Sequence, residues 1–147
     1  MSLPLTNAAL THTAADVLSE YLRQQSLLGT YEVRLNGATS DTGHLLLTFS
    51  DTSPSQTSDM LNSNTVEDCG IQIRIRGLPD DQLTPRTFLV DLSRSLDILP
   101  NTAVTYGSST YRILAIHKAS GPLPLHRDIQ RRWEWTLNVT ATITQLT

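Results

Sequence analysis

The chain has 147 residues, of which 39% are hydrophobic and 17% charged, and its net charge is −3 at neutral pH. A chain of this length can bury a core as one domain, and its acidic balance argues against a generally basic nucleic-acid binder. The basic residues are ten arginines and one lysine. Because guanidinium groups suit planar, bidentate contacts, this bias favours contacts with other proteins.

Cys69 is the single cysteine of the chain, so no intrachain disulfide can form and a reducing compartment is expected. The sequence contains no apolar run of the roughly 18–20 residues that a membrane span requires. The first residues, MSLPLTNAALTHTAAD, carry neither a basic start nor a continuous apolar stretch, so they do not resemble a signal peptide. We therefore expect a soluble, intracellular protein.

The first half of the chain predicts one helix and two strands. Apolar residues at helical spacing predict a helix over residues 14–28, with Thr13 capping its start and Gly29 ending it. Alternation predicts a short strand within residues 30–37, and HLLLTF at 44–49 predicts a more buried strand. Residues 50–70 are rich in Ser, Thr and Asp, so we expect a flexible or functional loop there.

The segment GIQIRIRG at 70–77 predicts a strand with one apolar face and one charged face. Ile71, Ile73 and Ile75 lie on the first face, opposite Gln72, Arg74 and Arg76. A second helix is expected next, with Thr84 as N-cap, Pro85 in its first turn, the apolar stripe Phe88, Leu89, Leu92, Leu96 and Leu99, and Pro100 as its stop.

The last third predicts three more strands. Residues 102–106 and 110–117 read as a hairpin around Gly107, and residues 118–130 as a loop bent by Pro122 and Pro124. Six consecutive alternations from Trp133 to Ile143 predict a long strand with one buried face. The whole chain, 1–147, is therefore expected to be a single α+β domain with two helices on one face of a mostly antiparallel sheet of four to six strands.

No arrangement of residues points to catalysis or to a cofactor. The histidines share no metal-ligand spacing with one another or with Cys69. Asp80 and Asp81 precede a helix, where carboxylates usually serve the helix dipole and a turn. The stretch GSST at 107–110 lacks the pattern of a nucleophile elbow and fits a hairpin turn. We expect no enzyme, with no catalytic, cofactor-binding or metal-binding residues.

The charged sheet face admits three interpretations. Arg74 and Arg76, with Arg131 and Arg132, form a cationic patch if their strands are neighbours. In the first interpretation the face is simply solvated, with cross-strand pairs such as arginine to Glu134. In the second it binds nucleic acid, which the lack of aromatic residues on that face disfavours. In the third it binds a protein partner, because an uncovered sheet face with open edge strands invites one.

Two segments resemble the small minor capsid and tail-terminator proteins of tailed bacteriophages, over roughly residues 14–143. The first carries Gln72, Arg74, Arg76 and Gly77 in the order Q-hydrophobic-R-hydrophobic-R-G. The second carries Asp128, Arg132 and Asn138, with the aromatic Trp135 between them. Two features depart from the family pattern: the loop at 50–70 is longer, and Arg131 stands where the family often has a small residue.

The resemblance implies a structural virion protein that forms a ring, usually a hexamer, at the head–tail junction. Such a ring would terminate the tail tube and contact a neck or head-completion protein, and DNA would pass through its lumen without specific binding. It would assemble in the host cytoplasm without a membrane partner. The expected subunit-interface residues are Arg74, Arg76, Asp128, Arg131, Arg132 and Asn138. The alternatives are a head-closure or neck connector subunit and a nucleic-acid-binding module.

Overall fold

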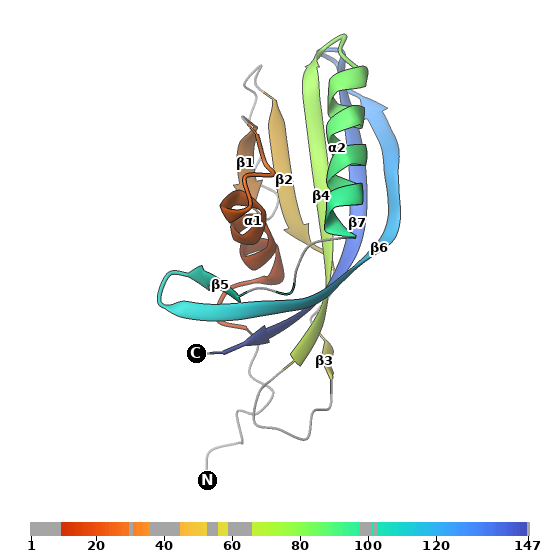
Figure 1. Cartoon of the computed structure of the whole chain (residues 1–147). Coiled ribbons are helices and arrows are strands. Elements are labelled where there is room, and N and C mark those ends of the chain that lie inside the picture. The colour runs from red at the N-terminus through yellow and green to blue at the C-terminus, as the bar shows by residue number, and fades with distance from the viewer. Residues whose placement is uncertain are drawn as a thin grey trace.

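The computed structural model describes residues 10–29, 31–35, 45–52, 56–58, 66–97, 101 and 103–146. Within these residues the chain forms two helices and one seven-stranded sheet. Both helices lie against the same face of the twisted sheet (Figure 1). The predicted α+β fold, with two helices on one face of a mostly antiparallel sheet, is therefore confirmed, and the sheet has one strand more than the four to six expected.

The elements follow one another along the chain as α1 (Ala14–Gln24), β1 (Glu32–Leu35), β2 (Leu46–Asp51), β3 (Gln56–Ser58), β4 (Val66–Pro79), α2 (Leu83–Leu96), β5 (Ala103–Tyr106), β6 (Ser109–Arg127) and β7 (Arg132–Gln145). Across the sheet the order is β1-β2-β4-β7-β6-β5, and β3 pairs with the start of β4. β1 is parallel to β2, and every other pair is antiparallel.

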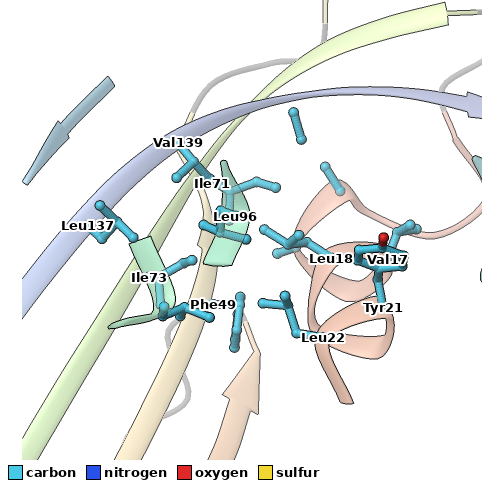
Figure 2. Packing of buried hydrophobic residues seen from close by; sticks show 14 of the residues in the cluster. Val17, Leu18, Tyr21, Leu22, Phe49, Ile71, Ile73, Leu96, Leu137 and Val139 are labelled. Carbon is cyan, nitrogen blue, oxygen red and sulfur yellow. The ribbon is translucent and has the colours of Figure 1, made fainter. Parts of the chain in front are cut away.

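The core lies between the sheet and the two helices. β4 contributes Ile71, Ile73 and Ile75, which are completely buried as the alternation predicts. Figure 2 shows β4 and β7 side chains gathered with those of α1 and with Leu96 of α2. Trp135 is buried in this core, and Trp133 packs partly against it. Full burial of one isoleucine side chain stabilises the fold by roughly 1.5–3 kcal/mol, so this apolar face dictates the register of the central strands.

The helix ends differ from the prediction in detail. The Thr13 hydroxyl accepts the N–H of Asp16 at 3.3 Å, which confirms the cap, but α1 ends at Gln24, just before Ser26 adopts a left-handed φ of +58°. The prediction of Thr84 as N-cap is wrong, because α2 begins at Leu83 and Asp81 accepts the N–H of Thr84. This backbone hydrogen bond lowers the pKa of the Asp81 carboxyl.

Two predicted loops contain strands. In the 50–70 segment, β3 pairs with the first residues of β4, and β4 begins at Val66; residues 53–55 and 59–65 lie outside the described residues. The prediction of a loop at 118–130 is wrong, because β6 continues to Arg127 and pairs with β7 throughout. Its register shifts and its outer position tolerate Pro122 and Pro124, which would break a regular central strand.

Some predicted features cannot be compared with the structure. His44, Leu99 and Pro100 lie outside the described residues. Neither helix of the described part of the chain is long and apolar enough to cross a membrane.

Candidate functional site

The sheet face that points away from the helices carries the polar side chains of the central strands, and we call it the polar face. On it Gln72 lies opposite Asn138 in the β4–β7 register, and Arg74 lies opposite Thr136. The two segments that resemble the phage proteins, more than fifty residues apart in sequence, therefore occupy neighbouring strands. They form one structural unit in this fold.

A cross-strand ion pair occupies the middle of the polar face. Arg74 Nε and Nη2 donate to the two carboxylate oxygens of Glu134, each at 3.1 Å. His126 Nε2, on β6, lies 2.6 Å from Glu134 Oε2. The Arg74 side chain is 41% exposed and that of Glu134 only 13%, so solvent screens the pair and its contribution to stability is about 1 kcal/mol or less. The cross-strand pair predicted for Glu134 is confirmed.

A second row of hydrogen bonds runs across the same face. Gln72 Nε2 donates to Asn138 Oδ1 at 3.5 Å, and Asn138 Nδ2 donates to Ser120 Oγ at 2.9 Å. Further along β7, the Thr142 hydroxyl donates to Asp68 Oδ1 at 2.7 Å. These bonds join β4, β7 and β6 through their side chains, so the polar face presents an ordered surface.

Some side chains of the polar face are buried by neighbouring residues of the same chain. Arg76 is 8% exposed and lies opposite Leu46 on one side and Glu134 on the other. Thr136 and Leu46 are also buried. Arg76 is therefore a poor candidate for direct contact with a partner, whereas the Arg74 guanidinium reaches solvent.

The second family-like segment begins with the turn between β6 and β7. Asp128 Oδ1 accepts the N–H groups of Gln130 and Arg132 at 3.0 and 2.9 Å, and its Oδ2 accepts Arg132 Nε at 2.8 Å. The Arg132 side chain is 6% exposed, so this pair acts mainly within the chain, where it closes the turn. Burial raises the pKa of the Asp128 carboxyl, but the hydrogen bonds from Arg132 and Gln130 outweigh it, so the pKa is lowered.

Three of the four arginines proposed as a cationic patch form separate ion pairs with carboxylates. Arg131 adopts a left-handed φ of +61° and places its Nη2 3.1 Å from Asp80 Oδ2. Arg74 meets Glu134 and Arg132 meets Asp128. The strands are neighbours, as that interpretation required, but Arg74, Arg131 and Arg132 each lie beside a carboxylate, and the fourth arginine, Arg76, is buried. These four arginines therefore do not form a continuous cationic surface.

An apolar tip lies at the same end of the sheet. Ile129, in the β6–β7 turn, is 98% exposed, and Leu83 at the start of α2 is 68% exposed. The Asp80 N–H donates to the Arg131 carbonyl at 2.8 Å, which ties the β4–α2 turn to the β6–β7 turn. Ile129 is therefore an exposed apolar side chain at a turn that is held from both sides.

The open edge of β6 is the feature that the sequence prediction missed. β5 pairs with β6 only at Ser109–Arg112. Beyond that point, in the part of the chain that the structure describes, β6 pairs with β7 alone. Exposed Leu114, Leu123 and Leu125 follow this edge, and Ile113 to Ile116 line a small pocket of about 60 Å³. The leucines alternating with prolines at 122–125 are the sequence signal that could have predicted a strand.

The described residues hold no cluster of three or more metal-ligating side chains. Cys69 lies buried in β4, within the hydrophobic core. Its place among apolar side chains fits a packing role.

Comparisons with known proteins add little. No protein-family model matches the chain, and no curated protein matches it. One solved structure, whose name states no function, aligns at a TM-score of 0.49 and 11% identity, covering 92% of this chain and 98% of the other. A likeness of this size supports no conclusion about function.

Proposed function

We propose that this chain is a structural virion protein that forms a ring, of six subunits, at the head–tail junction of a tailed phage. The ring terminates the tail tube and joins the tail to the head. The observation that carries the proposal is the open edge of β6 with its exposed leucines. An open strand edge offers unpaired backbone N–H and C=O groups to another chain, and a defined neighbour in an assembly satisfies these groups.

The resemblance of the two paired segments supplies the phage assignment. Gln72 and Asn138, taken from the two segments, form a hydrogen bond across neighbouring strands. This arrangement places both segments on one face of the sheet, so they can act together in the proposed assembly. In the proposed ring, the polar face and the apolar tip at Ile129 are available to the tail tube protein and to a neck or head-completion protein.

The charge distribution favours a protein partner over nucleic acid. Arg74, Arg131 and Arg132 each lie beside a carboxylate, so binding phosphates would require these ion pairs to be broken. The net charge of −3 acts in the same direction. In the proposed assembly, DNA passes through the lumen without specific binding.

The test uses the purified chain and a tail tube protein from the same genome. Tube protein is allowed to polymerise with and without this chain, and tube lengths are measured by electron microscopy. We expect shorter tubes with a ring at one end. Tubes of unchanged length would contradict termination of the tail tube. Binding to purified connector in preference to the tube would instead support the alternative of a head-closure subunit. Binding to DNA that weakens steeply with salt would instead support a nucleic-acid-binding module.

A further inference from the structure

Toward its two ends, the strand order carries opposite net charge in the described residues. β1 and β2 hold Glu32, Asp51 and Arg34, a net charge of −1, whereas β5, β6 and β7 hold Arg112, Lys118, Arg127, Arg132 and Glu134, a net charge of +3. Since β1 and β6 lie toward opposite ends of the strand order, the β1 edge is weakly acidic and the β6 edge is basic.

β6 is the most consistently basic element. Its nineteen residues include Arg112, Lys118 and Arg127 and no Asp or Glu. Lys118 is exposed and lies opposite Val139 in the β6–β7 register, so it faces the helix-bearing side of the sheet. His117 is also exposed and lies opposite Thr140, so it faces the polar side.

β1 forms the other end of the strand order. In the described part of the chain it pairs with β2 alone. Glu32 lies opposite Leu46 and therefore faces the polar side, while Val33 lies opposite Leu47 and faces the core side.

The open stretch of β6 matches β1 in length and direction. Between its register shifts, β6 pairs regularly with β7 over the four residues Ala115–Lys118, and β1 also has four residues. The strand directions given by the ladders make β6 antiparallel to β1 within one chain. Copies related by rotation about an axis along the strands would keep these directions. The β6 edge of one copy would therefore meet β1 of the next as an antiparallel pair.

We propose that this junction closes the ring: the open edge of β6 docks on β1 of a second copy, and the sheet continues from subunit to subunit. The contact is heterologous, as a closed ring requires. The junction depends on the proposed function only for the claim that the copies close into a ring. The register that keeps apolar side chains on the helix side places Ile116 opposite Val33 and His117 opposite Glu32. The bulges and prolines that follow Lys118 limit the pairing to this short stretch.

Disulfide trapping tests the register. Directly opposed residues in an antiparallel pair have Cα atoms about 4.5–5.5 Å apart, which a disulfide can span. The double variant His117→Cys with Glu32→Cys, in a Cys69→Ala background, should give a ladder of cross-linked oligomers up to the closed ring after oxidation. The matched control, Lys118→Cys with Glu32→Cys, places the two thiols on opposite sides of the sheet and should cross-link at least about tenfold less.

The outcomes separate this junction from the function it serves. Light scattering on the unmodified chain, with tail tube protein present, reports whether a ring forms at all. A ring without the His117–Glu32 cross-link, or with equal cross-linking in the control, overturns the junction and leaves the ring intact. A monomer in both measurements overturns the ring and the junction together. Circular dichroism melts of both double variants confirm that each is folded before oxidation.

Charge reversal gives an independent readout of the same junction. His117→Glu should raise the concentration needed for assembly by about three- to tenfold, because it places like charges directly opposite each other at Glu32, at a cost of up to about 1 kcal/mol. An equimolar mixture with Glu32→Lys should recover assembly, because the altered β6 edge of one variant then meets the altered β1 of the other. Arg94→Gln on α2 makes the same change of charge away from the junction and should leave assembly unchanged. Equal effects of His117→Glu and Arg94→Gln would contradict the proposal.

Discussion

Replacement of Asp128 should destabilise the protein far more than its place in a surface turn suggests. Its carboxylate accepts two backbone N–H groups and the Nε of Arg132, whose side chain is 6% exposed. Removing the acceptor deprives a buried cation of its carboxylate, and hydrogen bonds to charged groups contribute about 1.5–3 kcal/mol each, although such losses are not additive. We expect Asp128→Ala to lower the free energy of unfolding by about 3 kcal/mol. Asp128→Asn keeps an acceptor for the backbone but removes the charge, so it should cost about 1–2 kcal/mol.

Urea denaturation of wild type and variants measures these losses. Asp80→Ala is the matched control, because it breaks the Asp80–Arg131 ion pair in which both side chains are more than half exposed, and it should cost less than about 0.5 kcal/mol. The pKa of Asp128 is lowered in the folded state, so its stabilisation is present above the unfolded pKa and is lost as pH falls through the folded value. The difference between wild type and Asp128→Asn should therefore shrink below about pH 4. Equal losses for Asp128→Ala and Asp80→Ala would refute the reasoning.

Two further substitutions test the packing of β6. A Cβ on Gly121 would lie 2.6 Å from the Thr136 carbonyl oxygen, at a φ of +99°, so Gly121→Ala should cost more than about 2 kcal/mol of stability in urea. Gly29→Ala, with a positive φ but only an ordinary contact with Tyr31 Cδ2 at 3.9 Å, should cost only about 1 kcal/mol. A similar loss at both glycines would contradict the close approach of β6 to β7. The buried Tyr111 hydroxyl accepts the N–H of His12 and bonds to its Nδ1 at 2.6 Å. Tyr111→Phe should therefore cost about 1–2 kcal/mol and speed proteolysis near His12, and unchanged proteolysis would show that this contact does not hold the segment.

Alternation of apolar and polar residues was enough to predict the central strands. Ile71, Ile73 and Ile75 alternate without interruption, and a shift of one residue would place all three in water. The long β7 strand was predicted for the same reason, and the apolar stripe beginning at Phe88 predicted the second helix. Each of these elements has one strongly apolar side, so burial decides its structure.

The course of β6 beyond Lys118 could not be read from local pattern. Pro122 and Pro124 normally indicate a loop, and the register shifts along β6 disrupt the alternation. Here pairing with β7 overrides the local propensity. β3 was missed because its three residues, Gln56–Ser58, have no apolar periodicity and depend on the partner strand β4.

The sequence identified residues of the candidate site, but it did not predict how deeply each is buried or which carboxylate each arginine contacts. Arg74, Arg76 and Arg132 appear alike in the sequence as outward arginines, yet only Arg74 reaches solvent to a large extent. Burial of Arg76 and Arg132 depends on what lies beside them in the folded sheet, and Asp128 acts on Arg132 through the shape of a turn. Side-chain partners of this kind follow from tertiary geometry, which strand alternation does not encode.

The mass of the native particle tests the central claim, that this chain completes its sheet with copies of itself. Native mass spectrometry is applied to the chain at rising concentration, alone and with tail tube protein. A species of about six times 16.3 kDa is the expected result, with a population that grows when tube protein is present. A single 16.3 kDa species under every condition would contradict the account.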